Sequence, residues 1–431
     1  MLNLVVAGIW AWLNLSKSAE LQLQPLEIIS WQDSLIFEIP TSQTSVVTEK
    51  NIQVYLQNLT QNGIPSDRQG IWIQSGWHSL ASNQGTTPLP AASLTKIATT
   101  LVALDHWGAK HQLVTKIYST GKIEEGVITG DLIVEGNGDP LLVWEEAIAI
   151  GNTLNRLGIN SIQGDLLVTE QFYMNYQRQP QKSGELFKQA LNHQQWQPEI
   201  TQQYLQMPEA TPQPQVAIAG EVRLVEAIPS QSRLLLSHQS LPMAEILRQM
   251  NIYSNNQMAQ MLADLLGSAK EIATTAAAVA DFPAAEIQLI NGSGLGEANL
   301  ISPRAVCQML IAIDRLLKSS AMTAADLFPT AGKDLVGTTK DRGFPPGISV
   351  KTGTLDNVSA LAGVIPTRDR EHIYFSMINY GHQYQYFRQQ QDLLLNELVK
   401  EWQLIPTDFN LAQEPIWFLG DPRRNELNSQ Q

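Results

Sequence analysis

The hydrophobic pattern of the chain changes character twice. From about His111 to Val225, short apolar runs such as those at 130–134 and 164–168 alternate with Gly-rich turns, as in a set of short strands. Helical periodicity dominates before and after this stretch, and a chain of 431 residues is longer than one compact core usually holds. These features predict a separate β-rich lobe inserted into a domain whose two halves lie far apart in the sequence.

We expect the first half of that domain to occupy residues 21–112, the lobe residues 113–235 and the second half residues 236–431. Within the lobe, the Gln-rich stretch from Gln177 to Gln197 is typical of a surface loop.

Outside the lobe, apolar spacing and turn residues predict helices and strands. A helix is predicted over Ser93–Asp105, where apolar residues recur on one face. Three β-like runs at residues 347–354, 358–364 and 373–379 are separated by short turns, which predicts an antiparallel meander. A last amphipathic helix, near Tyr384–Trp402, brings the chain back over that sheet.

Composition excludes several classes of function. With 43% hydrophobic and 16% charged residues, the chain is ordinary globular material. Its net charge of −13 and its lack of any basic run argue against a nucleic-acid partner. The single cysteine, Cys307, excludes an internal disulfide framework and a Cys-based zinc site, and the seven histidines show no HExxH pairing. We therefore expect no metal and no cofactor.

Residues 1–20 carry an apolar stretch that has two interpretations, a signal or anchor segment and a first helix packed on the core. The unbroken apolar part, Leu4 to Leu13, is too short to span a bilayer but fits the hydrophobic region of a signal peptide. No Lys or Arg precedes it and no clean A-x-A cleavage site follows, so the residues alone leave both interpretations open.

The string AASLTKIATT contains the first candidate for chemistry, Ser93 followed three residues later by Lys96. On a helix, residues i and i+3 share a face, so the amine of Lys96 can lie beside the hydroxyl of Ser93. A serine hydroxyl becomes a nucleophile when a base takes its proton, and a lysine is such a base if burial keeps it partly neutral. The alternative is an N-cap serine with a solvated lysine. The same spacing recurs at Ser119 and Lys122, where Gly121 argues against a helix.

Ser254-Asn255-Asn256 stands at the entrance to another predicted helix. In a catalytic site, Ser254 would pass a proton to a leaving amine, while Asn256 would orient Lys96 and hold an amide oxygen of the substrate. The alternative is the ordinary N-cap of a helix, for which Ser and Asn are both suited.

Lys351-Thr352-Gly353 lies at the end of a predicted strand. Lys351 and the hydroxyls of Thr352 and Thr354 offer a cation and hydrogen-bond donors for a carboxylate, and Gly353 lets a substrate backbone approach the strand closely. The alternative is a Gly-containing strand end with a solvated lysine.

The three strings together favour the catalytic interpretation. Ser-x-x-Lys, Ser-Asp-Asn and Lys-Thr-Gly form the motif set of class A β-lactamases and penicillin-binding proteins. Here they occur in that chain order, each on the type of element that the site needs: a helix start, a helix entrance and a strand.

The sequence around the motifs resembles one family, the class C low-molecular-mass penicillin-binding proteins. These are D-alanyl-D-alanine carboxypeptidases/endopeptidases with a lobe inserted between their first two motifs. The resemblance covers about residues 50–380 and includes TTPLPAASLTKIATTLVAL, GDLIVEGNGDPLL, INSIQGDLLV, LPMAEILRQMNIYSNNQMAQMLADLLG, NGSGLGEANLIS and VKTGTLDNVSALAGV.

The resemblance implies a role for each motif residue. Ser93 would be the acylated nucleophile and Lys96 its base, and the backbone N–H groups of Ser93 and Thr354 would form the oxyanion hole. The implied catalytic residues are Ser93, Lys96, Ser254 and Asn256, and the implied substrate-binding residues are Lys351, Thr352, Gly353 and Thr354.

The chain also departs from the family pattern. Asn255 stands where the family usually has Asp, and the Asp-Gly-Ser-Gly-Leu stretch begins here with Asn291. Gly296-Glu297 follows where Ser-Arg is usual, which puts in doubt the contacts of those side chains. The insert is shorter than is typical of the family.

The expected fold class is α/β of the α+β type. An antiparallel sheet is flanked by helices, as in penicillin-binding proteins and serine β-lactamases, and carries the β-rich inserted lobe. The expected function is a serine-type D-alanyl-D-alanine carboxypeptidase/endopeptidase that acts on peptidoglycan stem peptides and is acylated by β-lactams. Two alternatives remain, a serine β-lactamase or esterase on the same scaffold and a non-catalytic peptidoglycan-binding protein.

An enzyme of this kind would act in the periplasm or cell envelope. That location favours the signal or anchor interpretation of residues 1–20, and peripheral membrane association is a further expectation.

Overall fold

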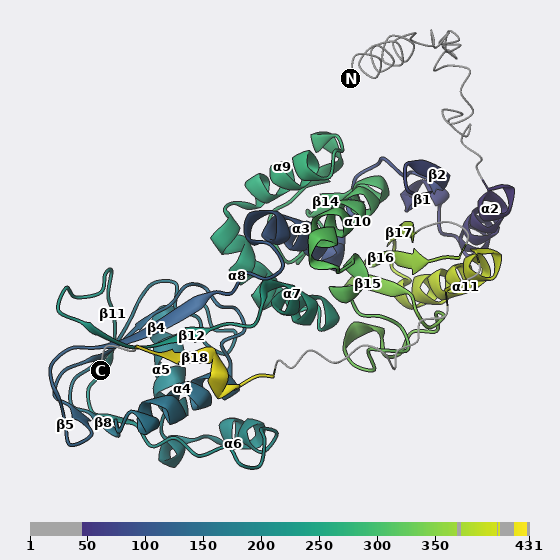
Figure 1. Ribbon diagram of the computed structural model, residues 1–431. Helices are drawn as coiled ribbons and strands as arrows, with labels where there is room; N and C mark the ends of the chain where they lie inside the picture. Colours follow the sequence, from purple (N-terminus) through teal and green to yellow (C-terminus); the bar gives the residue numbers. More distant parts are fainter. Residues whose placement is uncertain (1–44, 369–371, 403, 406–417, 429–431) are drawn as a thin grey trace, which may run out of the picture. The chain divides into compact units, whose positions relative to one another are not determined.

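The centre of the fold is a five-stranded antiparallel sheet with the order β15-β16-β17-β1-β2, shown in the computed structural model of Figure 1. The structure describes residues 45–368, 372–402, 404–405 and 418–428. The strands of this sheet are β1 (Gln69–Ser75), β2 (His78–Asn83), β15 (Ser349–Leu355), β16 (Val358–Pro366) and β17 (His372–Tyr380).

The predicted meander is confirmed, because β15, β16 and β17 pair in sequence order. Beside it, β17 pairs with β1 in the register Gln69↔Asn379 to Ser75↔Ile373. The sheet therefore joins segments from before and after the inserted lobe.

Helices cover both faces of this sheet (Figure 1). On one face, α2 (Val46–Gln61) and α11 (Tyr384–Trp402) pack against inward side chains such as Leu361 and Ile365. On the other face, α3 (Thr95–Trp107) and α10 (Pro303–Leu317) belong to a larger core that includes Ala360, Ala362 and Val364. Successive side chains of β16 therefore point alternately into the two cores, as the two-residue period of a strand buried on both faces requires. The predicted antiparallel sheet flanked by helices is thus confirmed.

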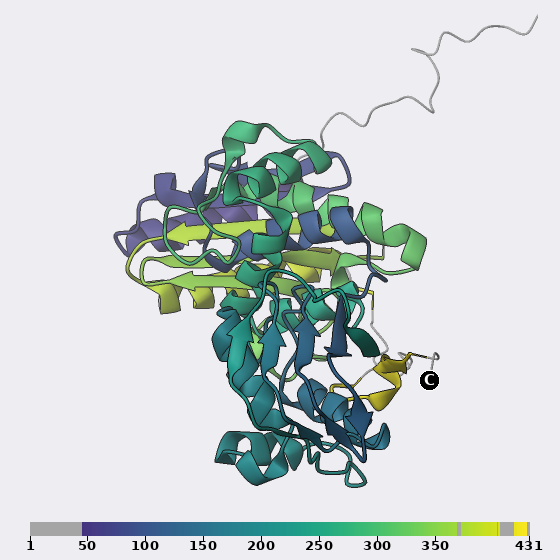
Figure 2. The same ribbon diagram turned by 90° about the vertical axis from the view of Figure 1, so that its left-hand side faces the viewer.

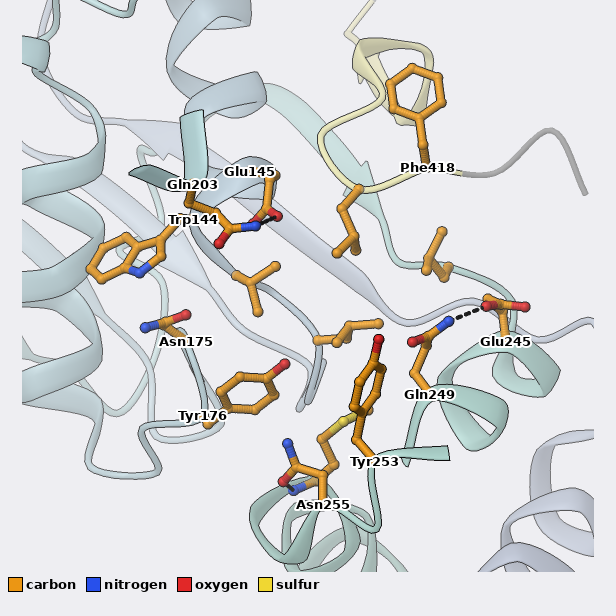
Figure 3. A pocket seen from close by; sticks show the side chains of 15 residues that line it. Trp144, Glu145, Asn175, Tyr176, Gln203, Glu245, Gln249, Tyr253, Asn255 and Phe418 are labelled. Carbon is orange, nitrogen blue, oxygen red and sulfur yellow. Dashed lines mark hydrogen bonds between the residues drawn. The ribbon is translucent and has the colours of Figure 1, made fainter. Parts of the chain in front are cut away.

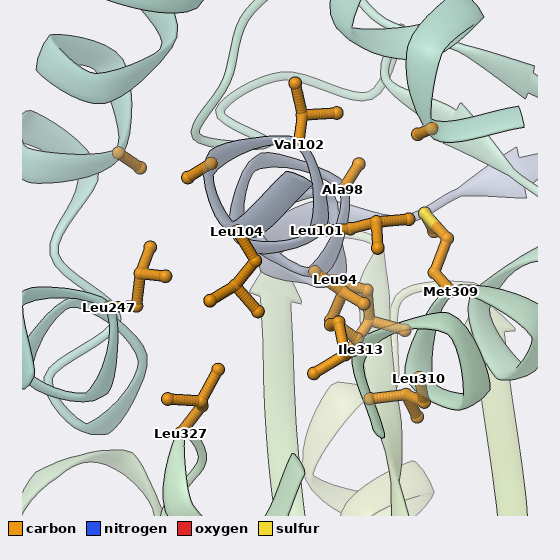
Figure 4. Close-up of a cluster of buried hydrophobic side chains, with 14 of the residues drawn as sticks. Leu94, Ala98, Leu101, Val102, Leu104, Leu247, Met309, Leu310, Ile313 and Leu327 are labelled. Carbon is orange, nitrogen blue, oxygen red and sulfur yellow. The ribbon is translucent and has the colours of Figure 1, made fainter. Parts of the chain in front are cut away.

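Helix α3 is buried on all sides, whereas its apolar spacing predicts a single buried face. Every residue from Thr95 to Leu104 is buried. In Figure 4, Leu101 lies near Met309, and Leu104 points toward Leu247. Further helices of this core are α7 (Met243–Ile252), α8 (Asn256–Leu266) and α9 (Ala269–Val279). A helix enclosed in this way holds its first turn rigidly in place.

The inserted lobe contains two sheets, with the orders β11-β9-β7-β4-β12-β18 and β10-β8-β6-β5. Its strands before the C-terminus are β4 (Val114–Ser119), β5 (Ile123–Glu124), β6 (Val127–Ile128), β7 (Leu132–Glu135), β8 (Ser161–Ile162), β9 (Leu166–Val168), β10 (Ala217–Ile218), β11 (Val222–Leu224) and β12 (Arg233–Gln239). β7, β9 and β11 pair in parallel, so the chain must cross over between them. The crossovers contain α4 (Trp144–Arg156), α5 (Pro180–Ala190) and α6 (Pro198–Tyr204).

Helix α5 corrects the prediction of a surface loop over Gln177–Gln197. Pro180 occupies the first turn, where a proline suits a helix, and Phe187 contacts Phe172 edge to face with ring centroids 5.5 Å apart. Gly184 lies where a Cβ atom would come within 2.4 Å of Val222. Because glutamines dominate the local composition, the short buried face of this helix cannot be recognised from composition alone.

The C-terminal strand β18 (Asn425–Leu427) pairs with β12 and completes the sheet of the lobe, as Figure 2 shows for the yellow C-terminal segment. This differs from the expected division, which assigns all of residues 236–431 to the second half of the other domain. Strand β12 also crosses the expected boundary at residue 235. A buried ion pair explains why β18 belongs to the lobe: Arg424, next to β18, binds Glu146 of α4. The side chain of Arg424 is 3% exposed and that of Glu146 is 1% exposed.

The candidate signal or anchor segment, residues 1–20, lies outside the described residues. Within them, none of the helices combines the length and apolarity that crossing a bilayer requires.

We predict that Arg424→Ala lowers the free energy of unfolding by about 3 kcal/mol, because it leaves the Glu146 carboxylate buried without its cation. Urea unfolding followed by tryptophan fluorescence measures the loss. Arg233→Ala is the control, since Arg233 lies on β12 of the same sheet but is exposed. Equal losses in the two variants would show that the ion pair does not stabilise the lobe.

Candidate active site

Ser93 and Lys96 lie together at the start of α3. A short 3-10 turn (Ala92–Leu94) leads into the helix, and Nζ of Lys96 lies 3.1 Å from Oγ of Ser93. The same Nζ lies 2.7 Å from Oδ1 of Asn256 and 2.7 Å from the carbonyl oxygen of Ser293. Lys96 is therefore not a solvated lysine, and the alternative interpretation of this motif, an N-cap serine with a solvated lysine, does not hold.

The environment of Lys96 favours its uncharged form. The side chain is fully buried, and burial lowers its pKa from 10.5 to about 7. A neutral amine has two N–H donors and one lone pair. In that neutral form, the oxygens of Asn256 and Ser293, which only accept hydrogen bonds, can take both N–H groups and leave the lone pair for the hydroxyl of Ser93. This arrangement suits removal of the Ser93 proton.

The second motif lies in the turn between α7 and α8. Ser254 has a φ of 52°, an unfavourable backbone conformation for a serine, and its Oγ accepts a hydrogen bond of 2.9 Å from Nζ of Lys351. Asn256 is the first residue of α8 and contacts Lys96 as described. The motif thus contacts both lysines of the site.

In the third motif, Lys351 is only 1% exposed and lies on β15. Its Nζ also donates to the carbonyl oxygen of Thr352 at 2.9 Å. Burial lowers the pKa of Lys351 well below its ordinary value, and the nearby Lys96 lowers it further. The hydroxyl of Thr352 contacts Thr338 at 2.7 Å, whereas the exposed Thr354 accepts a hydrogen bond from Nη2 of Arg388 at 2.8 Å.

Gly353 brings the third motif against the first. A Cβ atom at this position would lie 3.0 Å from the carbonyl oxygen of Ala91 and 3.1 Å from the backbone N of Ser93. The sequence suggests room for a substrate backbone here, whereas the structure shows that the glycine lets β15 approach the turn that carries Ser93.

The loop that follows β13 (Ile287–Gln288) also belongs to the site, although the sequence predicts no catalytic or substrate-binding residue in it. The carbonyl of Ser293 binds Lys96, and a Cβ atom on Gly294 would lie 1.9 Å from the carbonyl oxygen of Ala92. Oδ1 of Asn291 accepts hydrogen bonds from both backbone N–H groups of Ser293 and Gly294, at 3.1 and 2.8 Å. The string NGSGLG was the available signal. An Asn side chain supplies the same accepting oxygen as the usual Asp, so this departure preserves the loop.

Asn255 has a structural role that explains a second departure. It is the N-cap of α8, and its Oδ1 accepts hydrogen bonds from the N–H groups of Gln257 and Met258 at 2.9 and 3.0 Å. Asn and Asp cap helices about equally well. The replacement of Asp by Asn therefore keeps the helix start that positions Asn256.

A pocket of about 430 Å³ lies directly beside the second motif (Figure 3). Tyr253 and Asn255, the neighbours of Ser254, line it on one side, and Trp144 and Tyr176 of the lobe line it on the other. Aromatic rings and a few polar groups are typical of ligand pockets. Within the part of the chain that the structure describes, no group of three or more His, Cys, Asp or Glu residues could hold a metal ion.

We predict that Asn255→Ala destabilises the protein by about 1 kcal/mol, because two N–H groups at the start of α8 lose their acceptor. Urea unfolding measures the change, and Asn255→Asp serves as the control that keeps an accepting oxygen. If Asn255→Ala and Asn255→Asp unfold at the same urea concentration, the cap contributes nothing.

The sequence matches the profile of a known protein family. The profile of the D-Ala-D-Ala carboxypeptidase 3 (S13) family matches residues 49–194 and 201–398. The D-alanyl-D-alanine carboxypeptidase DacB of Haemophilus influenzae is 28% identical over 153 residues, 34% of this chain and 29% of that protein. A D-alanyl-D-alanine carboxypeptidase of an Actinomadura species is 29% identical over 184 residues, 39% of this chain and 34% of that protein. The chain thus matches about a third of the length of these curated relatives.

Solved structures share the fold. A predatory endopeptidase of Bdellovibrio bacteriovorus, in complex with an immunity protein, superposes with a TM-score of 0.69 at 18% identity and covers 83% of this chain and 99% of its own. The penicillin G-acylated form of that endopeptidase superposes with a TM-score of 0.67 at 20% identity, covering 78% and 94% of the two chains. The family profile spans most of this sequence and includes all three motifs. The chain therefore belongs to the D-Ala-D-Ala carboxypeptidase 3 (S13) family.

Proposed function

We propose that this protein is a serine-type D-alanyl-D-alanine carboxypeptidase/endopeptidase that cleaves peptidoglycan stem peptides through an acyl-enzyme on Ser93. The observation that carries the proposal is the buried amine of Lys96, whose Nζ lies 3.1 Å from the Ser93 hydroxyl. Membership of the family supports the same activity. The names of the two curated relatives also agree with it.

Acylation begins when Lys96 takes the proton of Ser93 and Oγ attacks the carbonyl carbon of the penultimate D-alanine. The backbone N–H groups of Ser93 and Thr354 hold the oxyanion, and the close approach at Gly353 supports this pairing. When the C–N bond breaks, the hydroxyl of Ser254 gives its proton to the leaving amine and recovers one from Lys96, so that the proton taken from Ser93 ends on the leaving group. Lys351 lies 2.9 Å from that hydroxyl, so it orients Ser254 for the transfer.

Water then hydrolyses the acyl-enzyme and restores Ser93. Cleavage of a peptide cross-link follows the same steps with a larger leaving group. The pocket beside Ser254 offers room and polar groups for the peptide that precedes the two D-alanines. Since peptidoglycan lies outside the cytoplasmic membrane, the proposal places the protein in the periplasm or cell envelope, with peripheral membrane association as a further part of it.

The first test is the intact mass of the protein after exposure to penicillin. We expect a long-lived adduct of one penicillin on the wild type and none on Ser93→Ala, together with D-alanine release by the wild type from a D-Ala-D-Ala peptide. Rapid hydrolysis of penicillin without an adduct would instead indicate a serine β-lactamase. Absence of both adduct and D-alanine release would indicate a non-catalytic peptidoglycan-binding protein.

The second test is the pH dependence of the acylation rate. Because the neutral amine of Lys96 is the base and its pKa is about 7, the rate should rise with pH and level off above that value. At pH 6, about a tenth of the plateau rate is expected. Lys96→Arg should not form the adduct at any pH from 5.5 to 8.5, since a guanidinium does not lose its proton in this range. A rate that is constant over this range in the wild type would contradict the assigned base.

A further inference from the structure

The substrate of the proposed reaction carries a negative charge that this site must bind. The leaving residue ends in a carboxylate, and the sequence assigns Lys351 as its cationic anchor. In the structure, however, Lys351 is 1% exposed and already donates to Ser254 and to the carbonyl of Thr352. A buried amine with two internal hydrogen bonds is a poor choice for the main anchor of an incoming anion.

A second cation reaches the third motif from α11. Nη2 of Arg388 donates to Oγ1 of Thr354 at 2.8 Å, and the guanidinium lies 5.5 Å from the ring centroid of Tyr384. The side chain is partly exposed. A guanidinium stays charged at every physiological pH and has further N–H donors in a planar fork that matches a carboxylate.

The charge of Arg388 is not neutralised by its neighbours. Asp392, one turn further along the helix, is the usual position for an ion-pair partner. Asp392 instead accepts hydrogen bonds from Arg342, at 2.9 Å from Nε and 2.6 Å from Nη2. Among the described residues, no carboxylate forms an ion pair with Arg388.

On the other side of the turn between β15 and β16, Arg68 lies over the ring of Tyr380, 6.0 Å from its centroid, and no hydrogen bond joins it to β15 in the described part of the chain. Glu297, at the position where the family usually has Arg, accepts hydrogen bonds from Nδ2 of Asn357 and from the hydroxyl of Tyr380, at 2.9 and 3.1 Å. Among the described residues, Arg388 is therefore the partly exposed cation that hydrogen-bonds directly to the end of β15.

We propose that Arg388 and the hydroxyl of Thr354 together bind the carboxylate of the leaving residue, which makes Arg388 a specificity-determining residue; this inference rests on the proposed function. Because Oγ1 of Thr354 accepts the hydrogen bond from Arg388, its own O–H is free to donate. The exposed Thr354 and the partly exposed Arg388 then offer the carboxylate one hydroxyl donor and one charged donor.

The test is equilibrium binding in a Ser93→Ala background, where no acyl-enzyme forms. Two probes are used, a stem-peptide analogue ending in D-Ala-D-Ala with a free carboxylate and the same peptide with a C-terminal carboxamide. We expect Arg388→Gln to raise the Kd of the free acid by at least about tenfold and to leave the Kd of the carboxamide unchanged. Arg388→Lys should recover part of the affinity for the acid, because it keeps the charge but not the fork.

The matched control is Lys400→Gln, which removes one positive charge from an exposed position on the same helix, about 18 Å further along its axis. It should change neither Kd. Equal weakening of both peptides by Arg388→Gln would assign Arg388 a purely structural role, and no weakening of either would exclude it as the anchor. Both results overturn the inference whether or not the wild type forms the penicillin adduct, which tests the proposed function separately.

Discussion

The site depends on one constraint, the burial of an amine that carries no partner of opposite charge. Lys96 lies on the buried helix α3, and its amine hydrogen-bonds to neutral oxygens of Ser93, Asn256 and Ser293. Removing an ammonium group from water is costly, so the protein shifts the equilibrium toward the free amine instead. Helix α3 is buried on all sides from Thr95 to Leu104, and this enclosure holds that amine in place.

Close backbone packing then brings the other groups to that amine. Gly353 and Gly294 allow a strand and a loop to press against the turn that carries Ser93: a Cβ atom on Gly294 would collide with that turn, and one on Gly353 would be in tight contact with it. Two residues of the site, Ala92 and Ser254, adopt positive φ values of 47° and 52°. Such conformations cost free energy, and the packed surroundings must supply it. The site is therefore assembled by the whole core and not by the motifs alone.

Prediction from sequence was most successful where a pattern is local. The meander of β15 to β17 and helix α11 follow from apolar spacing, and the three motifs identify five side chains that the structure links through hydrogen bonds. It was least successful where partners are distant. The Gln-rich α5 is stabilised by the contact of Phe187 with Phe172, which lies outside the helix. Strand β18 is held on the lobe by the ion pair between Arg424 and Glu146. Neither partner is visible in the local sequence.

The sequence by itself determined the chemistry available to this protein, because two serines, two lysines and an asparagine at motif spacing carry that information in their identities. It also determined that a lobe interrupts the domain, since the change in periodicity is a property of the chain. Only the tertiary structure decided what each group does. Burial, which depends on contacts between distant segments, lowers the pKa of Lys96 to about 7. The same contacts enclose Lys351 and leave Arg388 open to solvent beside Thr354. The protonation state of a side chain depends on its burial and on neighbouring charges, and these are set only once the chain has folded.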